Sequence, residues 1–163
     1  IKINYLKKNK KFLQRFLIKN KIRGTIIISK EGINGTISGK SKDIKTLIKS
    51  GGSLLLSTPN SNDILMTIMY KEFSSFFYRT QHKWYFNEES LVKCAKLAGF
   101  DVEQVSFVHR QPLSNALFWL KDKHPKGNLE MAGINLNASE LWKAYLSKTK
   151  QSCTIYLKLK NND

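Results

Sequence analysis

The chain has 163 residues, of which 41% are hydrophobic and 11% aromatic, so it is a globular chain of one or two small domains and not a disordered polymer. It has no apolar run near the roughly 20 residues that cross a bilayer, and we expect no membrane partner. The net charge of +16 is uneven: residues 1–50 carry 14 Lys and Arg against two acidic residues, whereas residues 51–163 carry 14 against ten. Such asymmetry is typical of a nucleic-acid-binding part joined to a more neutral part, although a lysine-rich composition throughout explains it equally well.

The first predicted element is an amphipathic helix from Tyr5 to Asn20, because apolar residues recur there at helical spacing with lysines between them. Its outer face would be basic and could contact RNA phosphates without reading sequence. A solvated lysine face is the commoner explanation for such a pattern. The candidate RNA-binding residues on this face are Lys7, Lys8, Lys10, Lys11 and Arg15.

A hairpin and a short helix are predicted next. Arg23–Ser29 is rich in β-branched residues and indicates a strand, with a returning strand at residues 36–38. The dipeptide Asn34-Gly35 predicts the reversal between them, because both residues tolerate positive φ. A short helix capped by Ser41 or Asp43 would follow and carry apolar residues up to Ile48.

The segment from Arg23 to Gly39, RGTIIISKEGINGTISG, closely resembles the N-terminal domain of the rhodanese-type tRNA uridine hydroxylases. The resemblance covers residues 1–45 and implies a ferredoxin-like or acylphosphatase-like αββα fragment with affinity for RNA. In that family the catalytic cysteine belongs to a following rhodanese domain. Neither Cys94 nor Cys153 lies in the compact Arg- and Gly-flanked loop that such a site requires, so the resemblance does not imply hydroxylation by this chain.

The second part of the chain opens on a strand, Ser53–Thr58, which lies between a Gly pair and Pro59. A continuous apolar run bounded in this way is typical of a strand covered on both faces. Polar residues at the end of such a strand face ligands in open α/β sheets. Thr58 and Asn60 are therefore substrate-facing candidates, and equally they are turn formers that need no ligand.

The remaining elements are predicted from periodicity and capping signals. We expect one packed helix over residues 63–78 and a helix over residues 88–98 that Asn87 caps and that has Cys94, or alternatively Ala95, on its inner face. A strand over residues 102–109, two helices near residues 114–120 and 139–147, and a final strand at a sheet edge over residues 153–160 complete the chain.

The segments GGSLLLSTPN and HKWYFNEESLVKCAKLAGFDVEQV, with the terminal strand, resemble the C-terminal half of a class I S-adenosylmethionine-dependent methyltransferase. The resemblance covers residues 47–160 and implies a partial doubly wound, Rossmann-like α/β sheet that lacks its N-terminal half. It also implies methyl transfer to a small-molecule acceptor. The glycine-rich cofactor turn is absent, so we expect no cofactor-binding residues and an inactive chain when it is alone.

The site residues that this second resemblance implies are one catalytic candidate and a group of substrate-facing residues. His82 would orient or deprotonate an acceptor, unless it is a loop histidine packed on its aromatic neighbours. The three histidines lack metal-ligand spacing, and no metal is expected. The two isolated cysteines are typical of a cytoplasmic protein. The substrate-facing candidates are Thr58, Asn60, Tyr85, Arg110 and Asn115.

Residues 1–50 and 51–163 are thus expected to form two domains, a basic acylphosphatase-like fragment and a methyltransferase-like half-domain. Three functional hypotheses follow. The first is a methyltransferase-like protein that acts on a small molecule, and the second is an RNA-binding fragment of a uridine hydroxylase-like protein. The third is a composite fragment without native activity.

Overall fold

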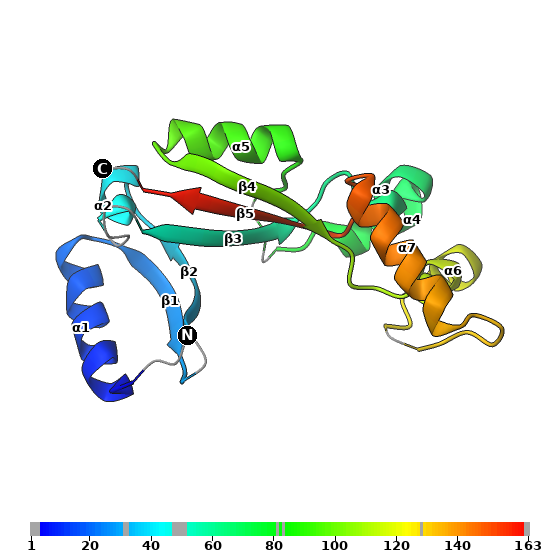
Figure 1. The fold of residues 1–163 in the computed structure, drawn as a ribbon, viewed down its shortest axis with the longest axis horizontal. Helices are drawn as coiled ribbons and strands as arrows, with labels where there is room; N and C mark the ends of the chain where they lie inside the picture. Colours follow the sequence, from blue (N-terminus) through cyan, green and yellow to red (C-terminus); the bar gives the residue numbers. More distant parts are fainter. Residues whose placement is uncertain are drawn as a thin grey trace. The chain divides into compact units, whose positions relative to one another are not determined.

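The computed structural model of the chain describes residues 4–30, 33–46, 52–80, 82, 84–127 and 129–161. It is a mixed α/β structure that contains two small antiparallel sheets (Figure 1). The chain divides into two compact units, which are described one at a time below. Unit 1 is formed by Ile1–Gly52 with Asn161–Asp163, and unit 2 by Ser53–Lys160.

Unit 1 combines one long helix, a two-stranded antiparallel hairpin and a short helix. The predicted first helix and the predicted strand after it are both confirmed. The long helix contacts the first strand of the hairpin, and Ile22, between the two in the chain, is 6% exposed. The elements are α1 (Leu6–Lys19), β1 (Arg23–Ile28), β2 (Ile33–Ser38) and α2 (Ser41–Lys45); residues 47 and 48, expected to extend α2, lie outside the described residues.

The reversal predicted at Asn34-Gly35 is wrong, because both residues lie inside β2 and pair with Ile27 and Ile26 of β1. The glycine has a different reason to be there. A Cβ atom at Gly35 would lie 2.3 Å from the carbonyl oxygen of Thr25, far inside van der Waals contact. Glycine in a strand interior often marks such a close backbone approach.

Unit 2 is built on a three-stranded sheet of β3 (Ser53–Pro59), β4 (Asp101–Val108) and β5 (Thr154–Lys160). The strand order is β3-β5-β4, and β5 pairs antiparallel with both neighbours. The last strand was expected at an edge, and this expectation is wrong: it occupies the centre, with Ile155 and Leu157 fully buried. The described residues do not show the expected doubly wound Rossmann-like sheet.

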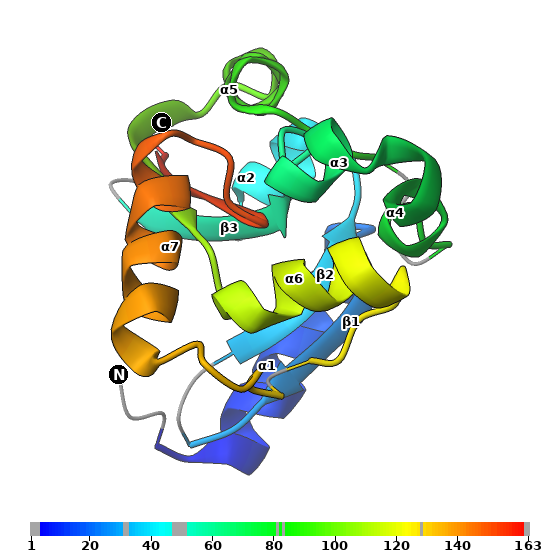
Figure 2. The ribbon, with the colours of Figure 1, turned by 90° about the vertical axis from the view of Figure 1, so that its right-hand side faces the viewer.

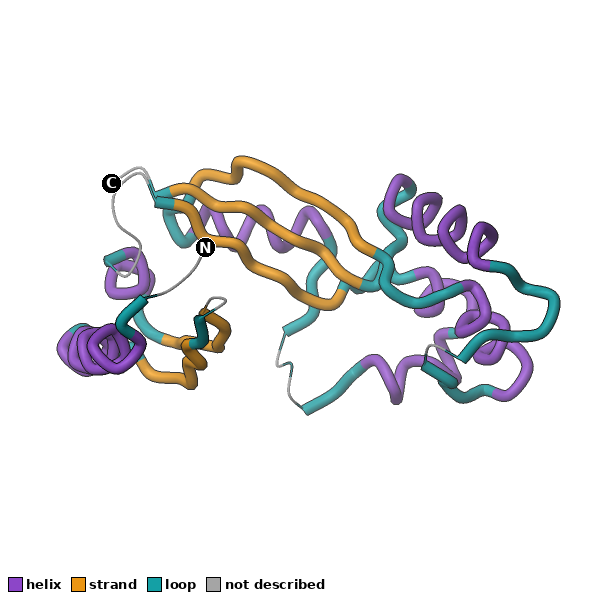
Figure 3. The backbone as a smooth tube through the Cα atoms, turned by 60° about the horizontal axis from the view of Figure 1, so that its bottom comes forward, coloured by secondary structure: helices purple, strands orange, loops and turns teal. Residues whose placement is uncertain are grey.

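One face of this sheet is covered by α5 (Glu88–Leu97), as Figure 1 and Figure 3 show. The expectation that β3 is covered on both faces is wrong, because its residues alternate in burial and Leu55 is 65% exposed. In β4 a bulge between Val102 and Gln104 absorbs one residue. The bulge keeps Val102 and Val105 on the same face, opposite Leu159 and Leu157 of β5.

The cap predicted for α5 is confirmed: the Asn87 side chain accepts the backbone N–H of Ser90 at 2.9 Å, and the Ser90 hydroxyl closes a capping box. The inner face of the helix is formed by Leu91 and Ala95, which are buried. Cys94 is exposed, so its predicted place in the core is wrong.

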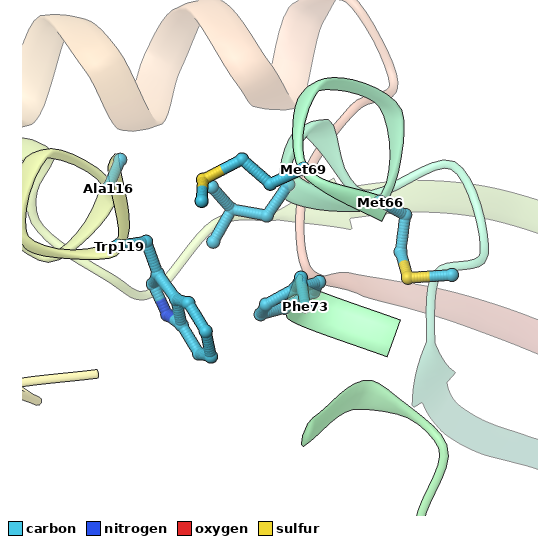
Figure 4. Close-up of a cluster of buried hydrophobic side chains, with 6 residues drawn as sticks. Met66, Met69, Phe73, Ala116 and Trp119 are labelled. Carbon is cyan, nitrogen blue, oxygen red and sulfur yellow. The ribbon is translucent and has the colours of Figure 1, made fainter. Parts of the chain in front are cut away.

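Four helices gather beyond the end of the sheet where β3 and β4 finish and β5 begins (Figure 2 and Figure 3). The predicted single helix over residues 63–78 is interrupted at Met69, whose backbone (φ −141°, ψ 39°) is not helical. The core between these helices is apolar and includes Met66, Phe73 and Trp119 (Figure 4). The helices are α3 (Ile64–Ile68), α4 (Tyr70–Phe77), α6 (Leu113–Asp122) and α7 (Leu136–Lys148).

Candidate functional site

The outer face of α1 in unit 1 carries a close succession of cations. Lys7, Lys11 and Arg15 follow one another at four-residue steps along one face, with Lys8 and Lys10 beside them. All five side chains are exposed, and the four lysines border a shallow hollow beside Gln14. Within the described part of the chain, none of these cations has an ion-pair partner.

This placement of charge does not stabilise the helix. Lys7 and Lys8 stand in the first turn, where the helix dipole is positive, and that turn has no acidic residue. The N-cap residue, Tyr5, adopts a left-handed backbone (φ 55°) and provides no side-chain cap. Like charges four residues apart destabilise a helix by roughly 0.2–0.5 kcal/mol per pair. A bound polyanion would reduce the unfavourable interaction of these lysines with the helix dipole and the repulsion between neighbouring cations.

Unit 2 contains a cavity of about 340 Å³ at the end of its sheet. Pro59 at the end of β3, His109 just after β4 and Cys153 just before β5 border it on the sheet side. Its opposite walls are aromatic, so the cavity is mainly apolar with polar groups at selected places. The aromatic lining residues are Phe73, Phe76, Phe77, Trp119 and Trp142.

Asp63 is a buried carboxyl group on the cavity wall, with 3% exposure. It caps α3, and its Oδ1 accepts the backbone N–H of Leu65 at 2.8 Å. Burial raises the pKa of Asp63 from 3.8 to about 6, against the opposing effect of that hydrogen bond. The carboxyl group is therefore ionised at pH 7 at a cost in stability.

His109 is a second buried titratable group on the same wall, with 6% exposure. Burial, followed by the nearby positive charge of Lys143, lowers the pKa of His109 from 6.5 to about 4. The neutral ring accepts the backbone N–H of Cys153 on Nδ1 at 3.2 Å. This hydrogen bond places the ring proton on Nε2, because only one ring nitrogen of a neutral histidine carries hydrogen.

Two of the residues predicted for a substrate site, His82 and Asn115, line this cavity. His82 is exposed at its border, and its ring lies edge-on to Tyr85 with ring centres 6.0 Å apart. Tyr85 itself lies outside the lining, where its hydroxyl accepts the Arg79 N–H at 2.5 Å and bonds the Phe77 carbonyl at 3.0 Å.

The other predicted residues are placed elsewhere in unit 2. Thr58 is half-buried in β3, and the exposed Arg110 bonds the Tyr156 hydroxyl through its guanidinium group. Asn60 is fully buried, and its side-chain amide donates to the carbonyls of Lys150 at 2.9 Å and Ser152 at 2.8 Å. These contacts hold the loop before β5 against the end of β3.

Among the cavity-wall residues that were not predicted from the sequence are Asp63, Gln111 and Trp142. One of them carried a usable signal: an Asp directly before an apolar helical segment is a typical N-cap, which would have placed Asp63 at the end of β3. Gln111 and Trp142 reach the cavity only through tertiary packing. The described residues contain no cluster of three potential metal ligands, and no helix among them is long and apolar enough to cross a bilayer.

Comparison with known proteins bears on the first part of the chain. The family model described as "UPF0176 acylphosphatase like domain" matches residues 1–81. The N-terminal part of the chain is acylphosphatase-like. A relative of the chain is the tRNA uridine(34) hydroxylase of Pelagibacter ubique (strain HTCC1062), which is 62% identical over 47 residues. Those residues are 29% of this chain and 16% of that protein, so the chain matches less than a fifth of the relative's length.

These findings overturn the methyltransferase hypothesis. The matched family is described as acylphosphatase-like and the matched relative is named a tRNA uridine(34) hydroxylase, and the family match continues past unit 1 through β3 and the helices after it. The prediction of methyl transfer is wrong, and so is the prediction of S-adenosylmethionine as a cofactor. The patterns that suggested them, an apolar run between glycines and proline and a capped helix ending in Gly-Phe, are local signals that any α/β protein can use.

Proposed function

We propose that this chain binds RNA through the basic face of α1 and acts as the RNA-binding part of a tRNA-modifying protein related to the uridine hydroxylases. The observation that carries the proposal is the row of exposed cations Lys7, Lys8, Lys10, Lys11 and Arg15 on a helix that they destabilise. The identity to a protein named a tRNA uridine(34) hydroxylase supports RNA as the polyanion.

The geometry suits a phosphate backbone better than a single small anion. Successive cations on one helix face are about 6 Å apart along the axis, since four residues rise 1.5 Å each. Lysine contributes a point charge on a flexible stem, which follows a backbone without reading bases. We therefore expect binding that depends on salt and little on sequence. A cytoplasmic location, expected from the isolated thiols, is consistent with such a partner.

Hydroxylation itself is left outside the proposal. The chain matches 16% of the length of the named hydroxylase. The two cysteines of the chain differ in their surroundings. Cys94 is exposed on α5, whereas the Cys153 thiol contacts the Val108 carbonyl at 3.5 Å on the cavity wall. RNA binding is the function that the described geometry favours.

The test is the binding of an unmodified tRNA transcript to the full chain, followed by fluorescence anisotropy between 50 and 200 mM salt. Five phosphate contacts predict a slope of log Kobs against log salt of about −3.5 to −4.5. Affinity would then fall roughly a hundred- to five-hundredfold over that range. The variant K7A/K8A/K10A/K11A retains only Arg15 of the five and should show a slope near −1.

A matched control removes four exposed lysines from helices of unit 2, in the variant K71A/K93A/K96A/K121A. Both variants lower the net charge from +16 to +12, so a difference between them reports position and not total charge. Equal losses of affinity and slope in the two variants would refute an RNA site on α1. Binding of wild-type protein that does not respond to salt would refute phosphate contacts altogether.

A further inference from the structure

An exposed aromatic ring stands beside the basic face of α1. Phe12 is 69% exposed, and it has cations as neighbours on the helix surface: Lys8 lies four residues before it and Arg15 three residues after it. Residues at these spacings are adjacent on a helix, with about 5–6 Å between their Cβ atoms. The ring is therefore within reach of any polymer that the two cations bind.

A second aromatic ring supports Phe12 from within unit 1. Phe16, one turn later, is half-buried, and its ring centre lies 6.3 Å from that of Phe12, with 32° between the ring planes. This separation is in the normal range for aromatic pairs. Phe16 thus holds Phe12 at the border between the half-buried apolar face of α1 and its exposed basic face, and leaves most of the Phe12 ring uncovered.

Exposure of an apolar side chain is not by itself evidence of a ligand, since single exposed apolar residues are normal on protein surfaces. The same helix contains such a residue in Ile18, which is 71% exposed. Phe12 differs from Ile18 in chemistry, because its ring has a flat π face on which another planar group can stack. The position of that face next to Lys8 and Arg15 is the feature that points to a particular ligand.

Cations and an exposed ring side by side suit a single-stranded nucleic acid. Proteins that bind single strands combine a basic track for the phosphates with aromatic side chains on which the bases stack. The bases of a duplex are paired and stacked on one another, whereas those of single-stranded loops and ends are free to stack on protein rings. Phospholipid headgroups and inorganic polyphosphate supply charge but no planar ring.

We propose that Phe12 stacks on an unpaired base of the RNA that α1 binds, so that this helix selects single-stranded RNA over duplex. The inference rests on the proposed function, because the phosphates beside the stacked base must lie on the cations of α1. Lys8 and Arg15 are about 10 Å apart along the helix axis and would contact phosphates on either side of that base. A phenyl ring stacks on any base, so the contact selects strandedness and not sequence.

The test compares Phe12→Ala with Ile18→Ala in the full chain, by fluorescence anisotropy with a labelled short oligouridylate and with an RNA duplex of the same length. The two substitutions are matched: each shortens an exposed apolar side chain three residues from Arg15. Alanine is the best helix former, and α1 has no fully buried residue, so neither substitution should unfold the helix.

Phe12→Ala should weaken binding of the single strand by roughly five- to 150-fold, the loss expected for one base stacked on an aromatic side chain. It should leave binding of the duplex unchanged, and Ile18→Ala should leave both unchanged. Phe12→Tyr keeps the ring and should bind the single strand as wild type does, whereas Phe12→Leu should lose affinity. The slope of log Kobs against log salt should stay the same in Phe12→Ala, because every phosphate contact remains.

Equal losses for the strand and the duplex in Phe12→Ala, or equal losses in Phe12→Ala and Ile18→Ala, would overturn the stacking role. Unchanged binding of the strand by Phe12→Ala would also overturn it, while salt-dependent binding of tRNA to the lysines of α1 would still stand. Failure of that tRNA binding would refute the proposed function and this inference together. Binding of phosphatidylglycerol vesicles that depends on Phe12, with no such dependence for oligouridylate, would identify a lipid surface and overturn the proposal.

Discussion

Replacing Asp63 by Asn should make unit 2 more stable at neutral pH and leave its stability in acid much less affected. The Asp63 carboxyl is buried and caps α3 through the Leu65 N–H. An amide oxygen can accept the same hydrogen bond, so Asp63→Asn keeps the cap and removes the ionisation. What remains is the cost of holding a charge in a poorly solvated place.

The magnitude follows from the two pKa values. A carboxyl group that titrates at 3.8 when unfolded and at about 6 when folded binds its proton more tightly in the folded state. The contribution of Asp63 to stability is therefore most favourable in acid and is lost as the pH rises from 3.8 through 6. The loss is about 3 kcal/mol at pH 7.5, of which about 2 kcal/mol develops between pH 4.5 and 7.5.

The assay is thermal unfolding followed by tryptophan fluorescence at pH 4.5 and 7.5. All three tryptophans, at positions 84, 119 and 142, lie in unit 2, so the signal reports this unit. The difference in melting temperature between Asp63→Asn and wild type should be about 8 °C larger at pH 7.5 than at pH 4.5, at roughly 4 °C per kcal/mol. Glu130→Gln, at an exposed position, removes a charge without this effect.

The comparison must be made as a difference between proteins, because His109 acts in the opposite direction over the same range. Its lowered pKa means that the unfolded chain takes up the proton first, so stability is lost as the pH falls from 6.5 towards 4. The two groups nearly offset each other in wild type. A melting-temperature difference between Asp63→Asn and wild type that does not change with pH would refute the reasoning.

Three further substitutions test other parts of the structure. In wild type, His109 lowers the free energy of unfolding by about 2.5 kcal/mol between pH 7.5 and 4.5, and His109→Asn should abolish this loss in urea titrations at the two pH values. A loss of the same size in the variant would contradict burial of a neutral ring. Asn60→Ala should destabilise unit 2 by about 2–4 kcal/mol in urea, because it leaves one buried carbonyl, one half-buried carbonyl and an N–H group without their partner. A loss below about 0.5 kcal/mol would show that water replaces the amide. Gly35→Ala should disorder the hairpin of unit 1 in amide spectra, whereas Gly39→Ala, where a Cβ meets nothing closer than 3.5 Å, should not; a native hairpin in the first variant would contradict the close approach of Thr25.

Elements with strong local signals could be predicted from the sequence. The periodic apolar residues of α1, the β-branched run of β1 and the Asn87 cap of α5 each specify structure within a few neighbouring residues. The same reasoning failed at Met69, because an apolar residue continues the helical pattern although its backbone leaves the helix. It failed at Gly35 because a strand glycine and a turn glycine look alike in sequence.

The sheet of unit 2 and its cavity could not be predicted in the same way. The position of β5 depends on pairing over about a hundred residues, as for Leu56 with Leu157, and no local pattern encodes such a partner. The bulge in β4 moves Val105 onto the face of Val102, at a spacing that strand periodicity forbids. Asn115 was predicted to face a ligand, but its unpaired oxygen becomes visible only when α6 and α7 are packed.

The central position of β5 has a consequence for how unit 2 is made. During synthesis β3 and β4 emerge long before the strand that both of them need, and they cannot complete the sheet with each other, because each of them pairs only with β5 among the described strands. Until residues 154–160 are released, both strands have unpaired edges, which is the condition that favours aggregation and the binding of chaperones. Folding of this unit should therefore begin late and proceed slowly, as expected for contacts that are distant along the chain.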